Sequence, residues 1–386
     1  MEKMVQACSR CRDGIRCSMH SGLIARLNGL PILLVFCLFA LTGCLPGNVL
    51  SDGSAWGALV VEEEIIYVGT QQGHVLALNA DNGNHVWAFA PEEEDSTQGA
   101  YSPPVVSGKN LFVGGYNGEL YNFDRQSGAL LWRKTTGARI VGGPAVSDGK
   151  VVVGSTEGVV YAFSVADGGM EWSFPPIGKI GAIWSTPAIS DGIVVVGSMD
   201  KKIYGLSLED GRELWQYETN GAIPTTPLVI DDIVVAGSFD RTLYAVDILS
   251  GIEKWSVGFS NWIWAGGTHS HNLIYVADLD GNVRAFTAGG LEAWSFRADG
   301  PIVSKPVIIG EVLVVASSDG RLYFLSKESG LQEEIAYNVG SDIKAGLGAR
   351  GSAVIYSIIG DEESVQSFDV SRGIKVWETS TKEIKR

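Results

Sequence analysis

The chain has 386 residues, of which 45% are hydrophobic, 19% are charged and 49 are glycine, and its formal net charge is −15. This composition is typical of a turn-rich globular protein and excludes a largely disordered one. The acidic balance repels phosphate backbones, so we expect no nucleic-acid partner, and solubility explains the charge itself.

Residues 1–43 are predicted to be an export signal. Arg26 precedes an apolar run from Leu30 to Leu41, the arrangement of a basic region followed by a hydrophobic one. Spanning a bilayer takes roughly 20 apolar residues, and this run is shorter.

The signal ends in Leu41-Thr42-Gly43-Cys44, which resembles the bacterial lipobox. The resemblance implies cleavage before Cys44 and lipidation of that residue; the alternative is an ordinary signal peptide or anchor with an incidental cysteine. Two or more acyl chains, at about 0.8 kcal/mol per buried methylene, would hold the protein on a membrane surface. Residues 44–55, rich in Pro, Gly and Ser, are then expected to form a flexible stalk.

No cysteine follows Cys44, so the remainder of the chain has neither a disulfide nor a thiolate for redox or metal chemistry. Cys8, Cys11 and Cys17 with His20 could be read as a zinc site. An export leader, or initiation at Met19, is the favoured interpretation, and we expect no metal.

Residues 56–386 are predicted to form one domain of eight similar repeats. A glycine followed four residues later by tryptophan recurs at intervals of 39 to 45 residues, with one copy, Gly330 and Glu334, lacking the tryptophan. Short β-branched runs between Gly, Asp and Ser turns indicate antiparallel strands. This period predicts an all-β, eight-bladed β-propeller of four-stranded antiparallel blades. The tryptophans at this position are Trp87, Trp132, Trp172, Trp215, Trp255, Trp294 and Trp377.

The fourth repeat serves as the model for one blade. Its strands are expected at residues 186–189, 193–197, 202–207 and 213–217, from the innermost to the outermost. The first copy starts at an inner strand and the last ends at an outer one, so the sequence leaves the closure of the ring open. A strand from residues 49–56 added to the last blade is one alternative.

The repeated tryptophans are expected to be structural. A small residue such as Ala77 or Gly205 stands six positions before the turn glycine in most copies. The pattern resembles the tryptophan-docking motif of quinoprotein-type propellers, which implies that each indole covers the small residue and a peptide of a neighbouring blade. In the seventh copy Phe324 takes the small position, and we expect it to fill the volume of the missing indole while Glu334 stays at the solvent edge.

A second set of aromatic residues falls where the repeats enter their innermost strands, at the expected mouth of the central channel. Large aromatic side chains are typical anchors for protein partners, so we predict a partner-binding surface; apolar plugging of the channel is the alternative. The acidic loop Pro91–Asp95 is expected on the same face, as part of that surface or simply solvated. The aromatic residues are Trp56, Tyr101, Trp184, Trp264 and, just outside this register, Trp262.

Signatures of an enzyme are weak. His269 and His271 share one face of a strand-like segment without a carboxylate or cysteine at ligand spacing, which favours a surface pair over a metal site. The chain has no nucleophile elbow or phosphate loop. We therefore expect no catalytic residues.

Copies such as VVGSTEGVVYAFSVADGGMEW resemble the pyrroloquinoline-quinone-type propeller repeat from Trp56 to Trp377. Quinone-dependent dehydrogenases of this family bind their cofactor with an adjacent cysteine pair, a calcium ion and a catalytic Asp, none of which matches here, so no cofactor is expected. Size, blade count and lipid anchor are closer to the non-enzymatic lipoproteins of outer-membrane β-barrel assembly.

The sequence thus predicts an exported, monomeric, lipid-anchored scaffold that binds a protein partner in the cell envelope. In a cell with two membranes it would sit on the periplasmic face of the outer one, and otherwise on the outer cell surface. A quinone-dependent dehydrogenase or a small-ligand-binding propeller is the alternative.

Overall fold

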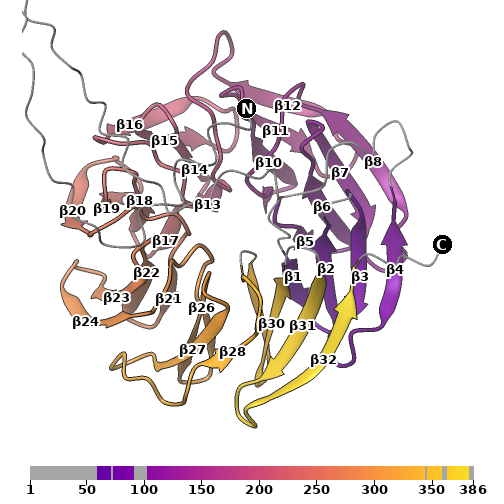
Figure 1. The fold of residues 1–386 in the computed structure, drawn as a ribbon. Coiled ribbons are helices and arrows are strands. Elements are labelled where there is room, and N and C mark those ends of the chain that lie inside the picture. Colours follow the sequence, from indigo (N-terminus) through magenta and orange to yellow (C-terminus); the bar gives the residue numbers. More distant parts are fainter. Residues whose placement is uncertain (1–58, 71–72, 91–101, 344–345, 359–362, 382–386) are drawn as a thin grey trace, which may run out of the picture. The chain divides into compact units, whose positions relative to one another are not determined.

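The computed structural model describes residues 59–70, 73–90, 102–343, 346–358 and 363–381. They form eight sheets of four strands each, which succeed one another around a common axis as the blades of a propeller (Figure 1). The predicted eight-bladed, all-β architecture is confirmed. Over these ranges no helix has the length and apolar character needed to cross a bilayer.

Each blade takes four consecutive strands, hydrogen-bonded in chain order from the axis outward. The strands of blades 1 to 4 are β1 Leu59–Glu62, β2 Ile65–Gly69, β3 Val75–Asn79, β4 His85–Phe89; β5 Val105–Ser107, β6 Asn110–Gly114, β7 Glu119–Asp124, β8 Leu130–Thr135; β9 Ala145–Ser147, β10 Lys150–Gly154, β11 Val160–Ser164, β12 Met170–Phe174; and β13 Ala188–Ser190, β14 Ile193–Ser198, β15 Lys202–Ser207, β16 Glu213–Glu218. Those of blades 5 to 8 are β17 Leu228–Ile230, β18 Ile233–Gly237, β19 Thr242–Asp247, β20 Glu253–Gly258; β21 Thr268–Ser270, β22 Leu273–Ala277, β23 Asn282–Thr287, β24 Glu292–Arg297; β25 Val307–Ile309, β26 Val312–Ser317, β27 Arg321–Ser326, β28 Tyr337–Asn338; and β29 Leu347–Arg350, β30 Ala353–Ile358, β31 Ser364–Asp369, β32 Ile374–Ser380.

The fourth blade matches its predicted strands closely. Strand β15 has the expected bounds, and β14 and β16 each extend one residue further. The innermost strand, β13, begins at Ala188 and not at residue 186. Pro187 precedes it, and proline has no N–H to donate to a sheet.

The hydrophobic core is divided among the eight seams between neighbouring blades. Each buried cluster joins strands of two adjacent blades, as the one around Trp215 joins blades 4 and 5. The two middle strands of a blade are covered on both faces, so β14 is buried along its whole length. The outermost strands are covered on one face, and β16 alternates between exposed and covered residues.

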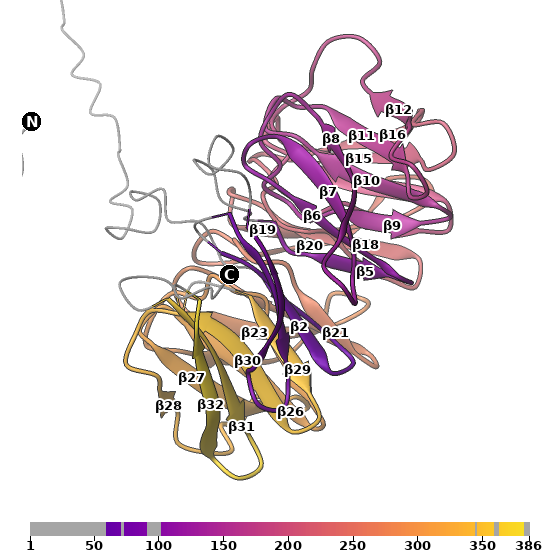
Figure 2. The ribbon, with the colours of Figure 1, turned by 90° about the vertical axis from the view of Figure 1, so that its right-hand side faces the viewer.

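The ring closes by side-chain packing between the first and last blades. The innermost strands β1 and β29 contact each other. Figure 1 shows β30 beside β1, and Figure 2 shows β29 and β30 beside β2. One buried cluster combines Ile66 and Leu76 of blade 1 with Ile355 and Val365 of blade 8. The last blade draws all four of its strands from residues 347–380. Residues 49–56, the alternative closing strand, lie outside the described residues.

Candidate functional site

Seven seams are locked by an indole that reaches from one blade to the next. The tryptophan lies on the outermost strand of its blade and packs over the turn glycine of the following blade; an added Cβ on Gly211, for example, would be 2.5 Å from Trp172. Each of these glycines has a φ near +70°, a conformation that other residues adopt only with strain. The turn therefore requires glycine for two reasons, its backbone conformation and the indole above it.

Each indole N–H also donates a hydrogen bond to a backbone carbonyl of the next blade. The pairs, with N···O distances, are Trp87 to Arg125 at 3.0 Å, Trp132 to Val165 at 3.1 Å, Trp172 to Leu208 at 2.9 Å, Trp215 to Ile248 at 2.8 Å, Trp255 to Ala288 at 2.8 Å, Trp294 to Lys327 at 3.0 Å and Trp377 to Ala80 at 3.0 Å.

The small residue lies in the same blade as its tryptophan, not in the neighbour, which corrects the docking arrangement expected above. Gly205 is the cross-strand partner of Trp215, and Ala245 that of Trp255. A register shift follows the residue opposite the tryptophan in all seven blades that carry the indole; this residue is small in six of them and is Asn122 in blade 2. Such a bulge redirects a side chain, and here it coincides with the point where the indole leaves its own sheet.

The seam between blades 7 and 8 differs because Glu334 stands where the indole would be. Phe324 is buried in this seam and stacks on Phe368 of blade 8, with ring centroids 5.5 Å apart, so it does point into the seam as expected. Glu334 is exposed. The phenyl ring does not fill the seam, however, since a cavity of about 200 Å³ remains beside it.

The structure brings three of the predicted mouth residues into one aromatic cluster. The rings of Trp184 and Trp264 meet edge to face with centroids 6.4 Å apart, although they belong to the entries of blades 4 and 6. Phe239 stacks on both Trp264, at 5.6 Å, and Trp262, at 4.7 Å. All four side chains are half-buried, so each offers ring surface to solvent. We call Trp184, Phe239, Trp262 and Trp264 the aromatic cluster.

The aromatic cluster is held by a buried isoleucine beside each entry position. Ile183 and Ile263, directly before Trp184 and Trp264, are fully buried. In the entries of blades 3 to 6 the isoleucine packs on the glycine that ends the second strand of the preceding blade; a Cβ on Gly237 would be 2.3 Å from Ile263. Alternate residues of the entry thus point to opposite sides, isoleucine into the core and the aromatic ring outward. The isoleucines at this position are Ile140, Ile183, Ile223, Ile263, Ile302 and Ile343.

Backbone hydrogen bonds fix these entries to the turns between the second and third strands. Met199 N–H donates to Ala182 O at 2.9 Å, and Leu279 N–H donates to Trp262 O at 3.0 Å. In blade 5, Asp240 accepts hydrogen bonds from the Tyr244 hydroxyl at 2.8 Å and from Asn220 N–H at 3.1 Å. Burial, together with this carboxylate, raises the pKa of Tyr244, which therefore stays a neutral donor near neutral pH. The aromatic cluster consequently sits on entries that hydrogen bonds join to the neighbouring turns.

Sequence reasoning missed Phe239. It lies in the turn after β18, and the same turn position holds Tyr116, Thr156 and Met199 in other blades, so no residue type marks it. Two of the predicted mouth residues, Trp56 and Tyr101, lie outside the described residues, as do Cys44 and the acidic loop Pro91–Asp95.

The two histidines do not form a metal site with the residues around them. Across the described ranges, no group of three or more His, Cys, Asp or Glu side chains is arranged to hold a metal ion. His269 lies on β21, where burial, and next the charge of Lys305, lower its pKa. His271 lies in the following turn with a φ of 51° and has its Nδ1 3.1 Å from the Ser270 hydroxyl.

Eight four-stranded blades, with an indole docked in seven of the eight seams, define the chain as a β-propeller of the pyrroloquinoline-quinone type. The family model described as outer membrane protein assembly factor BamB matches residues 71–180, 178–262 and 258–386. The chain therefore belongs to the BamB family, which confirms the resemblance seen in the repeats.

Individual relatives are similar over shorter stretches. Outer membrane protein assembly factor BamB of Moranella endobia is 27% identical over 122 residues, which are 29% of this chain and 31% of the relative. Quinohemoprotein alcohol dehydrogenase of Comamonas testosteroni is 28% identical over 132 residues, 29% of this chain and 18% of that protein. The alignments thus span about a third or less of the curated relatives. The crystal structure of BamB from Moraxella catarrhalis superposes with a TM-score of 0.65 at 19% identity, covering 78% of this chain and 92% of that one.

The residues present do not fit the quinone cofactor of the dehydrogenase relatives. The resemblance to those enzymes implies an adjacent cysteine pair, and residues 45–386 contain no cysteine. The aromatic cluster offers ring faces, and Asp240, the residue after Phe239, accepts hydrogen bonds from the Tyr244 hydroxyl and the Asn220 N–H.

Proposed function

We propose that the chain is a non-catalytic scaffold of the cell envelope that binds a polypeptide partner through the aromatic cluster and serves outer-membrane protein assembly. The observation that carries the proposal is the cluster itself, four half-buried rings that meet from three blades. Aromatic side chains are enriched among the residues that dominate protein interfaces. Membership of the BamB family supports the assembly role.

We further propose that the protein is exported and lipidated at Cys44, and that it acts as a monomeric propeller. Lipidation would place the propeller at a membrane surface, where an assembly partner would be concentrated. The motif Leu41–Cys44 and the apolar run before it support this proposal.

The partner proposal is tested by affinity capture of the full-length chain from detergent-solubilised membranes. The wild type should retain an envelope polypeptide that the Trp184→Ala/Trp264→Ala variant does not. Leu214→Ala, on the exposed side of β16, is the control and should retain it. Identical partner sets for the wild type and the double variant would refute the aromatic cluster as the docking surface.

A quinone-dependent dehydrogenase is the second candidate, favoured by the 28% identity to the Comamonas testosteroni enzyme. It predicts saturable uptake of pyrroloquinoline quinone in the presence of calcium, seen as a change in the absorbance of the quinone. The scaffold proposal predicts no such uptake.

A further inference from the structure

The seam between blades 7 and 8 keeps the backbone of an indole-docking seam although the chain supplies no indole there. Gly373 has a φ of +66°, like the turn glycines that lie under an indole. In the seven other seams the nearest indole atom would lie 2.4 to 3.0 Å from an added Cβ, whereas at Gly373 the nearest atom is Glu334 Oε2 at 3.8 Å. No ring therefore covers the Gly373 turn, and the nearest side-chain atom belongs to the Glu334 carboxylate.

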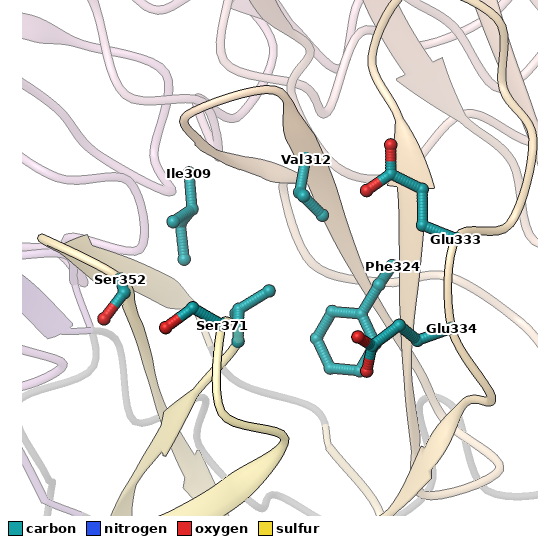
Figure 3. A pocket seen from close by; sticks show the side chains of 8 residues that line it. Ile309, Val312, Phe324, Glu333, Glu334, Ser352 and Ser371 are labelled. Carbon is teal, nitrogen blue, oxygen red and sulfur yellow. The ribbon is translucent and has the colours of Figure 1, made fainter.

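Close to this turn, between blades 7 and 8, lies an open pocket of about 200 Å³, and Figure 3 shows the side chains around it. An engineered apolar cavity of about 150 Å³ is sufficient to bind benzene, so this one has room for a flat ring system. Glu333 and Glu334 are exposed at its edge. Its lining residues are Ile309, Val312, Phe324, Glu333 and Glu334 from blade 7, and Ser352, Val370 and Ser371 from blade 8.

The carbonyl that would accept an indole N–H is also in place. In six of the seven filled seams the acceptor lies three residues before the turn glycine, as Leu208 precedes Gly211. Val370 lies three residues before Gly373 and lines the cavity. Its N–H donates to Ser352 O at 2.8 Å, the same backbone contact that Leu208 makes with Gly192. Among the described residues no donor is recorded for the Val370 carbonyl.

We propose that this cavity is a binding site for an indole ring, whose N–H donates to the Val370 carbonyl and whose face packs against Phe324. In the seven other seams, the same turn backbone is covered by an indole ring. Phe324 occupies part of the space that a tryptophan at position 334 would take, so the ring enters from outside the blade. The indole comes either from a free small molecule or from a tryptophan of a partner polypeptide.

The test is fluorine NMR of 5-fluoroindole titrated with the full-length protein, followed by competition. Unlabelled indole should displace the probe about 2- to 12-fold more effectively than indene, which has the same shape without the N–H, because one hydrogen bond contributes about 0.5–1.5 kcal/mol. Displacement by N-acetyl-tryptophanamide as well supports the site and assigns the source to a polypeptide. Displacement by indole alone supports the site and assigns a small molecule.

The decisive variant is Phe324→Ala/Glu334→Trp, which recreates the pair Ala285 and Trp294 of blade 6. It should lose the probe and raise the melting temperature, so that loss of binding cannot result from unfolding. Phe324→Ala alone removes one packing surface and should bind the probe more weakly than the wild type without abolishing binding. Glu213→Trp, which adds a tryptophan on an exposed strand position, should bind it as the wild type does.

Three results would overturn the proposal. These are the lack of saturable binding to the wild type, equal displacement by indene and indole, and unchanged affinity in the folded double variant. Should the double variant fail to fold, Val312→Phe fills the cavity from β26, and unchanged affinity in that variant would overturn the proposal equally.

Discussion

The indole N–H of Trp377 donates to the carbonyl of Ala80 at 3.0 Å, which joins the last blade to the first across 297 residues of chain. Thr379 adds a second contact of the same kind, its hydroxyl donating to Gly83 O at 2.8 Å. The closing seam therefore uses the same indole–carbonyl contact as six other seams of the ring.

Trp377→Ala should therefore destabilise the ring at its closing seam. We expect a loss of about 3–5 kcal/mol in the free energy of unfolding, the usual cost of truncating a packed tryptophan. Urea denaturation measures the loss, and hydrogen exchange should locate it in blades 1 and 8. Trp377→Phe keeps most of the ring volume and should cost less. Exchange that rises equally in all eight blades would contradict a local closing role.

Gly251→Ala should destabilise the protein through both its backbone and the indole above it. Gly251 has a φ of +68°, and an added Cβ would lie 2.7 Å from Trp215 Cδ2. Strained backbone of this kind costs about 1–3 kcal/mol. Gly258→Ala is the matched control, since nothing lies within 4 Å of its added Cβ. Equal melting temperatures of the two variants would show that the turn glycine is not required.

Trp264→Ala should cost less stability than Trp215→Ala, because the Trp264 ring is only partly buried whereas the docking ring of Trp215 is buried in its seam. We expect less than about 2 kcal/mol for Trp264 against about 3–5 kcal/mol for Trp215. Thermal and urea unfolding provide the comparison. Equal losses would favour the alternative that the aromatic rings only plug the channel mouth.

Asp369 should make stability depend on pH in the acid range. Hydrogen bonds, first from the Ser371 hydroxyl and then from Arg372 and Ser352, lower the pKa of Asp369 to about 2. An unfolded Asp titrates near 3.9, so this contribution is complete above about pH 4 and is lost as the pH falls toward 2. The stability gap between wild type and Asp369→Asn should therefore shrink between pH 7 and pH 2.5 in urea titrations. A stability difference between wild type and Asp369→Asn that does not change with pH would contradict the lowered pKa of Asp369. In the Ser371→Ala background, this pH dependence should be smaller than in the wild type.

The repeat pattern was sufficient to predict the fold because each blade uses the same kinds of residue at the same positions for its strands and turns. The bounds of β15 followed from apolar runs and Gly/Asp turns alone. The sequence did not predict that Trp215 packs on Gly205 of its own blade. A repeat gives the spacing of residues along the chain, but it does not show whether two residues belong to the same blade or to neighbouring blades.

The candidate site was predictable only in part. Trp184 and Trp264 share a register in the repeats and were found from it, whereas Phe239 joins them from a turn whose residue type varies. The cavity at blade 7 was missed for a different reason. The sequence predicts that Phe324 replaces the volume of the tryptophan that is missing at position 334. Only the packing of blade 8 against blade 7 shows that a pocket remains beside Phe324.

The central claim, that the aromatic cluster docks a polypeptide, is tested most directly by photo-crosslinking in living cells. A benzophenone amino acid placed at position 264 should yield one covalent adduct with an envelope polypeptide of outer-membrane assembly, and the same probe at the exposed position 171 of β12 should yield none. Equal adducts at both positions, or none at 264 in protein that is folded and exported, would contradict the account.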